Sequence, residues 1–140
     1  MDKKKQIEEI KELIYAAEFL LKKTYPITKD EKIFLQIIRE LYSSVSLMVQ
    51  MITASDSKKL LEKVVETLDK TKFPTLIGLF DVLHKLQSKI DNDLISFKRY
   101  NNYVICTNNY KVQVISEDLL DKYIKQTKDS YFELYKELDA

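Results

Sequence analysis

The fold of this chain is decided by positions 33–52, which read IFLQIIRELYSSVSLMVQMI. Apolar residues recur there every three or four positions, the spacing of one face of an α-helix. The expected inner face consists of Ile33, Ile37, Leu41, Val45, Met48 and Ile52, with Phe34, Ile38 and Val49 beside it. The pattern predicts a helix over about residues 29–54, roughly 39 Å long, which could form the spine of a bundle or of a dimer.

The residues before this segment predict a first helix. Apolar side chains fall at steps of three and four from Ile7 to Leu21, which is the pattern of an amphipathic helix. Pro26 is expected to end it, because proline lacks an amide hydrogen and its ring clashes with the preceding turn. Thr28 is the expected N-cap of the long helix, and Glu31 completes a capping box with it.

Three further helices are expected after position 54. A short third helix begins at Asp56 or Ser57, with an inner stripe of Leu60, Leu61, Val64, Val65 and Leu68. Pro74 fits the first turn of a fourth helix that reaches about Lys89 and is apolar on most of its circumference. Ser116 caps a last helix, whose inner stripe is Leu120, Ile124, Thr127, Tyr131, Leu134 and Leu138.

Between the fourth and last helices the sequence pattern changes. Residues 95–115 are rich in aromatic and β-branched side chains, which are typical of strands. Asn-Asn pairs at 101–102 and 108–109 are the expected turns, because asparagine tolerates positive φ. We expect a hairpin of residues 103–107 with 110–115, joined by a short strand at 95–98. The fold class is therefore mainly α, a five-helix antiparallel bundle with a small β-hairpin insert, in one domain covering residues 1–140.

Composition limits the class of protein. Hydrophobic residues make up 45% and charged residues 32%, the balance of a globular chain rather than a disordered one. Lys plus Arg is 23 and Asp plus Glu is 22, which argues against a protein that grips duplex nucleic acid mainly by charge. We expect no signal peptide and no membrane partner, because no apolar run is long enough. Cys106 has no partner for an intrachain disulfide, so we expect a cytoplasmic location.

Few side chains here suit catalysis. Asp81 lies one helical turn from His84, the only histidine, and a carboxylate in that place could orient the imidazole as a general base. The alternative, which we favour, is a structural hydrogen-bonding pair at the helix edge. No HxxH, HExxH or CxxC spacing occurs, so we expect neither a metal nor a cofactor. Cys106 is expected to be an inert thiol in a strand.

The insert is the better candidate for binding. Cations and aromatic rings interleave there, in Lys98, Arg99, Tyr100, Tyr103, Tyr110 and Lys111. This mixture suits single-stranded RNA, because rings stack on bases while cations meet phosphates. The alternative, which we favour, is that the tyrosines are strand residues with one packed side and a wet hydroxyl.

Several stretches between positions 33 and 138 carry a resemblance. They are the long helix through 33–52, VLHK at 82–85, ISFKR at 95–99, YVIC at 103–106, YKV at 110–112 and the capped last helix. In these the chain resembles small archaeal proteins related to the HEPN (higher-eukaryote and prokaryote nucleotide-binding) domain. The resemblance implies a helical bundle that often dimerises, sometimes pairs with a small nucleotidyltransferase and sometimes cuts RNA. The RNA-cutting members carry an arginine closely followed by a histidine, and neither Arg39 nor Arg99 is followed by one.

We therefore expect a non-catalytic interaction protein that binds a protein or RNA partner. We expect a homodimer, formed through an apolar face of the fourth helix or of the long second one. The alternative is a HEPN-type enzyme, in which His84 and Asp81 act with Lys98 and Arg99 on RNA or a nucleotide phosphate.

Overall fold

The computed structural model describes residues 3–53, 74–92, 95–106 and 111–139. This part of the chain contains four long helices, α1 (Lys3–Phe19), α3 (Ile33–Thr53), α5 (Pro74–Asp91) and α6 (Glu117–Asp139). A π-helical turn, η1 (Leu20–Thr24), and a short helix, α2 (Tyr25–Thr28), lie between α1 and α3. Strands β1 (Ile95–Arg99), β2 (Asn102–Cys106) and β3 (Val112–Ile115) lie between α5 and α6. The prediction of a mainly helical fold with a small antiparallel insert is confirmed.

The third predicted helix, which was to begin at Asp56 or Ser57, lies outside the described residues. The five-helix count therefore stays a prediction. The fourth predicted helix is α5, which begins at Pro74 as expected and ends at Asp91.

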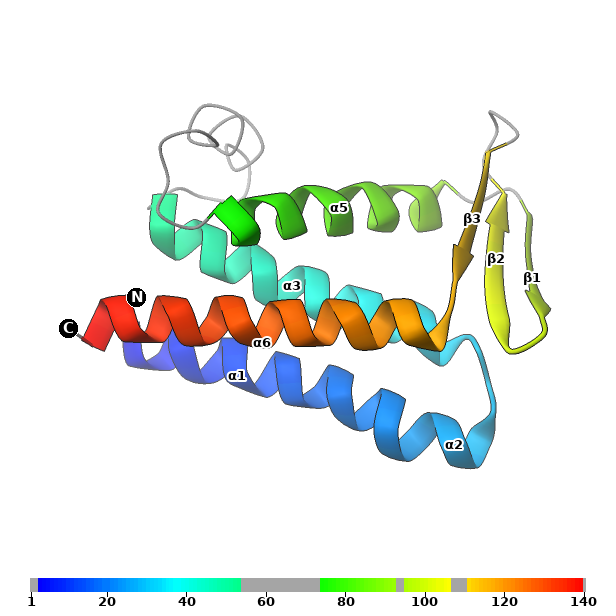
Figure 1. Ribbon diagram of the computed structural model, residues 1–140, viewed down its shortest axis with the longest axis horizontal. Helices are drawn as coiled ribbons and strands as arrows, with labels where there is room; N and C mark the ends of the chain where they lie inside the picture. Colours follow the sequence, from blue (N-terminus) through cyan, green and yellow to red (C-terminus); the bar gives the residue numbers. More distant parts are fainter. Residues whose placement is uncertain (1–2, 54–73, 93–94, 107–110, 140) are drawn as a thin grey trace.

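The long helices form an antiparallel bundle with the sheet at one end (Figure 1). Helix α1 packs on α3 and α6, and α5 packs on the same two helices. The sheet stands where α5 ends and α6 begins, while the N- and C-terminal ends of the chain lie at the opposite end of the bundle. The three strands are antiparallel neighbours in chain order, β1-β2-β3.

The helices bury the apolar stripes that the sequence predicts. On α3 the fully buried apolar residues are Phe34, Ile37, Ile38, Leu41, Val45, Met48 and Val49. On α5 the buried residues are Leu76, Ile77, Leu79, Phe80, Leu83 and Leu86. These side chains belong to one core cluster that also includes Tyr103, Ile105 and Ile115 of the sheet. The two stripes are buried inside this cluster and are not exposed for contact with a second copy of the chain. The homodimer through α3 or α5 stays a prediction.

The prediction that Pro26 ends the first helix is wrong. The helix continues through η1, in which the backbone amide of Tyr25 donates to the Leu20 carbonyl, and Pro26 occupies the first turn of α2. Proline is tolerated in a first helical turn, where an amide donor is not needed. The π-helical turn shifts the hydrogen-bond register just before it. The helix ends instead at Lys29, whose φ of 53° is left-handed.

The predicted capping box of Thr28 and Glu31 is also wrong. Thr28 is the last residue of α2, and its hydroxyl donates to the Thr24 carbonyl at 3.2 Å. Asp30 caps α3 instead, because its Oδ1 accepts the Lys32 amide at 3.0 Å and its backbone carbonyl accepts the Ile33 amide at 3.0 Å. Glu31 turns inward and is only 5% exposed.

The strand register decides which residues share a face of the sheet. Phe97 pairs with Val104, and Val104 pairs with Val114, so these three lie on one face. Tyr103 and Ile115 pair on the other face, which joins the core. The first predicted turn is shifted by one residue: Asn101 has the expected positive φ of 67°, but its turn neighbour is Tyr100 with a φ of 51°, and Asn102 already belongs to β2, where it pairs with Arg99. The second predicted turn lies at residues outside the described part.

Candidate binding surfaces

His84 contacts helix α3 rather than Asp81. Its Nδ1 lies 2.7 Å from the hydroxyl of Tyr42, and its ring stacks on Phe80 with centroids 6.1 Å apart. Asp81 points to Lys85, one turn later, at 3.0 Å. The structure therefore does not bring together the Asp81–His84 pair that a general base would use. The favoured alternative, a structural hydrogen bond between His84 and Asp81, is not found either, because His84 is paired with Tyr42 of α3.

Burial raises the pKa of the Tyr42 hydroxyl, and a hydrogen bond with Ser46 partly offsets this rise. The phenol therefore stays protonated at neutral pH, and it can donate its proton to His84. This contact joins α3 and α5 in the half-buried layer beside the core. This hydrogen bond therefore links α3 to α5.

Two negative findings concern only the described residues. Within them, no three His, Cys, Asp or Glu side chains gather into a group that could hold a metal ion. No helix among them is both long enough and apolar enough to cross a membrane.

The described members of the predicted binding set do not share one face of the insert. Tyr103 is 6% exposed and donates its hydroxyl to Ser96 at 2.7 Å, so its ring is not available for stacking. Lys98 lies on the same face as Tyr103 and forms an ion pair with Glu31 at 3.4 Å. Lys111 is exposed, and Tyr110 lies outside the described residues.

Arg99 and Tyr100 are exposed members of that set, and they contact each other. Tyr100 sits in the turn after β1 with a φ of 51°, and most of its side chain is in solvent. The Arg99 guanidinium lies over the Tyr100 ring, 5.7 Å from its centroid. Of the features predicted for an RNA-binding surface, the structure retains this cation stacked on an exposed aromatic ring. Single-stranded RNA stays a prediction for this turn.

The Glu31–Lys98 pair attaches the sheet to the helical bundle. Glu31 Oε2 is buried and has no hydrogen-bond partner among the described residues, and Lys98 is the nearby positive charge. The pKa of Tyr25 is raised, first by burial and second by the negative charge of Glu31. Lys98 is thus engaged within the fold, and phosphate contact would require it to leave a buried carboxylate.

The outer face of the sheet is an apolar surface that the sequence analysis did not single out. Phe97, Val112 and Val114 are 43%, 61% and 44% exposed, and Val104 lies between them. A hollow of about 410 Å³ is lined by Phe97, Arg99, Tyr100, Asn102, Val104, Val112 and Val114. The sequence signal for this surface is that β2 carries apolar residues at successive positions, so both faces of the middle strand are apolar. It becomes interpretable only once the strand register is known.

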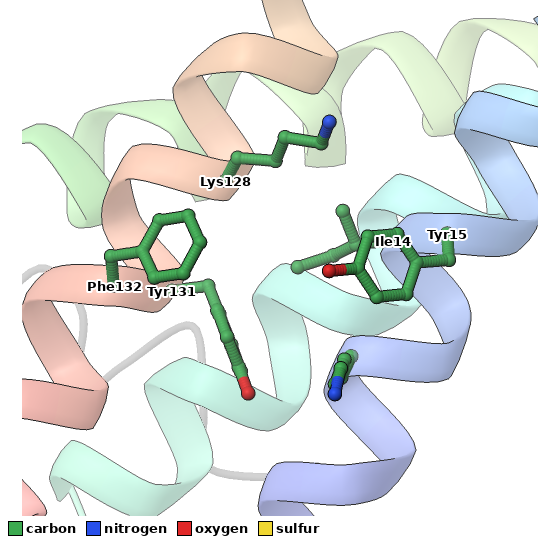
Figure 2. Close-up of a pocket in the computed structure, with 6 residues that line it drawn as sticks. Ile14, Tyr15, Lys128, Tyr131 and Phe132 are labelled. Atoms are coloured by element: carbon green, nitrogen blue, oxygen red, sulfur yellow. The ribbon is translucent and has the colours of Figure 1, made fainter.

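A second apolar surface lies between α1 and α6 (Figure 2). A cavity of about 90 Å³ is lined by Lys11, Ile14, Tyr15, Lys128, Tyr131 and Phe132. Figure 2 shows the side chains of α6 facing those of α1 across this cavity. Tyr15, Phe19, Phe132 and Tyr135, all on these two helices, are between 46% and 61% exposed. We call these four residues the aromatic strip.

Charged and aromatic contacts hold the walls of this cavity in place. Lys128 forms an ion pair with Glu18, and the Lys11 ammonium lies 5.8 Å from the centroid of the Tyr15 ring. The Tyr131 ring is 5.5 Å from Phe132, centroid to centroid. Burial raises the pKa of Tyr131, so its hydroxyl stays protonated. Tyr131 is buried in the inner stripe of α6, as its sequence position predicts, whereas the periodicity of α6 does not indicate a role for the aromatic residues beside that stripe.

Comparison with known proteins identified no relative of this chain. No protein-family model matches the chain, and neither the curated proteins nor the solved structures gave a match. The resemblance to HEPN proteins therefore stays a prediction.

Proposed function

We propose that this chain is a non-catalytic interaction protein that works as a homodimer, with the aromatic strip of α1 and α6 as the subunit contact. The observation that carries the proposal is the exposure of four large aromatic side chains on two adjacent helices. Tyrosine and phenylalanine are enriched at protein interfaces, because they bury a large apolar area at low entropic cost. The contact of His84 with Tyr42 supports the non-catalytic part of the proposal.

The size of this face suits a subunit interface. At ~1.5 Å per residue, α1 is roughly 26 Å long, and two adjacent helices span about 20 Å. The flat area is therefore about 500 Å², and protruding side chains add accessible surface to it. Stable interfaces bury about 800 Å² per partner, which is the same order.

The charges beside the strip suit contact between two copies of one chain. Lys11 and Glu18 of α1 and Lys128 of α6 place both signs close to the aromatic residues. In a twofold interface the same patch faces itself, so a patch of one sign would repel its copy. Here Glu18 pairs with Lys128 of the same subunit, so the patch carries both signs and this repulsion is reduced.

Sedimentation equilibrium over a wide concentration range tests the proposal. The wild-type protein is expected to approach twice the chain mass of 16.6 kDa as concentration rises. Phe132→Glu is expected to shift the protein to monomer, because it places a charge in the apolar centre of the contact. Tyr15→Glu on the facing helix is expected to do the same.

Val114→Lys is the matched control, since it adds a charge at an exposed apolar residue that lines the hollow of the sheet and not the cavity between α1 and α6. It is expected to dimerise like the wild type. A wild-type protein that stays monomeric, or a Phe132→Glu protein that dimerises normally, would refute the proposed interface. Circular dichroism establishes that each variant is folded.

A further inference from the structure

We propose that the outer face of the sheet binds an extended protein segment that carries apolar side chains beside a carboxylate. This inference is independent of the homodimer. It concerns the sheet at one end of the bundle, whereas the homodimer is formed by helices α1 and α6 (Figure 1). It rests on the lining of the hollow, on the charge of that lining and on the size of the face.

The lining predicts an apolar ligand. The walls of the hollow are almost entirely carbon, supplied mainly by Phe97, Val104, Val112 and Val114. Its volume of about 410 Å³ lies within the range of known ligand pockets. Alternate side chains of an extended segment lie about 7 Å apart. Residues two apart on one strand of the sheet have the same spacing, so the two sets of side chains can match.

The charge predicts a carboxylate. Among the residues that line the hollow, Arg99 carries a positive charge, and none is an aspartate or a glutamate. Arg99 lines the hollow and can form a bidentate pair with a carboxylate. Asn102 pairs with Arg99 across the strands and adds a polar group at the same end of the hollow.

The size excludes a second copy of the chain as occupant. Three strands about 4.8 Å apart and five residues long at ~3.4 Å each give a face of roughly 240 Å². This is well below the ~800 Å² that each partner of a stable complex usually buries. A short segment of a partner chain can be held by a face of this size.

The lining also favours a peptide over RNA. A stacking surface for bases needs several exposed rings and free cations along the backbone path. In the described insert, Tyr103 is buried and Lys98 is paired with Glu31, while valines fill the centre of the face. Burying an apolar side chain against valine costs less desolvation free energy than burying the edge of a base, because the polar groups of the base lose their water.

The test is selection of a random-peptide phage library on the whole 140-residue chain, followed by fluorescence anisotropy with the selected peptides. Enriched peptides are expected to contain apolar residues at alternate positions next to Asp or Glu. Val114→Lys is expected to weaken their binding at least about tenfold, a loss equivalent to about 1.4 kcal/mol. Val112→Lys is a second variant in case one of them disturbs β3.

Two further variants make the test specific. Arg99→Glu is expected to shift selection from acidic to basic peptides, which a merely structural residue would not do. Phe132→Glu, on α6, is expected to bind the peptides normally, so failure of the dimer and failure of this site are distinguishable. Unchanged affinity in Val114→Lys, or no enriched sequence, would overturn the inference. Binding of oligouridylate that is lost in Arg99→Glu, without peptide enrichment, would also overturn it in favour of RNA.

Discussion

Tyr42 and His84 show what a single side-chain contact decides in this protein. In the sequence His84 had one visible neighbour, Asp81, one turn away on the same helix. In the fold its partner is Tyr42 of α3, more than forty positions earlier in the chain, while Asp81 pairs with Lys85. A lone histidine beside an aspartate was therefore a weak indication of catalysis, because packing supplied a different partner.

A double-mutant cycle tests this contact. Tyr42→Phe and His84→Leu are each expected to lower the free energy of unfolding by about 1 kcal/mol, since each removes one partner of a half-buried hydrogen bond. The coupling between them should be about 0.5–1.5 kcal/mol, measured by urea denaturation.

The control pair is Tyr123→Phe with His84→Leu, which should show no coupling. A coupling near zero for Tyr42 and His84 would contradict the observed contact. Turnover of RNA or of a nucleotide that disappears in His84→Ala would support the HEPN-type alternative and contradict a non-catalytic role.

At the scale of elements, the boundary between α2 and α3 differs most from the sequence prediction. The residues Thr28, Asp30 and Glu31 offered two possible caps, and a Thr-x-x-Glu pattern fits the capping box. The chain instead places Thr28 inside the preceding helix and leaves Asp30 to accept the Lys32 amide. Glu31 is then free to pair with Lys98 of β1, which a role in the cap would have prevented.

The capping assignment gives a direct prediction. Asp30→Ala is expected to lower the free energy of unfolding by about 1 kcal/mol, the usual effect of removing an N-cap side chain. Thr28→Ala should have a smaller effect, because its exposed hydroxyl bonds mainly to a carbonyl of its own helix. Thermal unfolding of the two variants measures the difference, and the reverse order would restore the capping box.

At the scale of the whole molecule, two buried and two half-buried tyrosines make stability sensitive to alkali. Burial is the first cause of the raised pKa values of Tyr25, Tyr42, Tyr123 and Tyr131. These residues lie on α2, α3 and α6. Unfolding exposes all four hydroxyls to water, where tyrosine titrates near pH 10.

The sign of the pH dependence follows from these raised values. Above about pH 10 the unfolded chain loses protons that the folded chain still holds, so the unfolded state binds fewer protons and stability falls as pH rises. Below that pH the full stabilisation is present. Tyr123→Phe should flatten the fall by at most about 1.4 kcal/mol per pH unit, the effect of one proton. Urea denaturation between pH 8 and 11 measures it, and equal slopes in both proteins would contradict the prediction.

The sequence by itself determined the elements whose signals are local. The stripe of α3, the start of α5 at Pro74, the three strands and the positive φ of Asn101 all follow from residues within a few positions of each other. Periodicity and turn chemistry act at that range, so they can be interpreted without a fold.

Only the tertiary structure decided which surfaces remain exposed. The apolar outer face of the sheet depends on the register of Phe97, Val104 and Val114, and the aromatic strip depends on α1 lying beside α6. The passage of the helix through Pro26 depends on a π-helical turn that no local propensity predicts. Each of these features joins residues that are far apart in the chain or is set by tertiary packing. Local sequence leaves several such arrangements equally favourable, and the packing of the whole chain selects one of them.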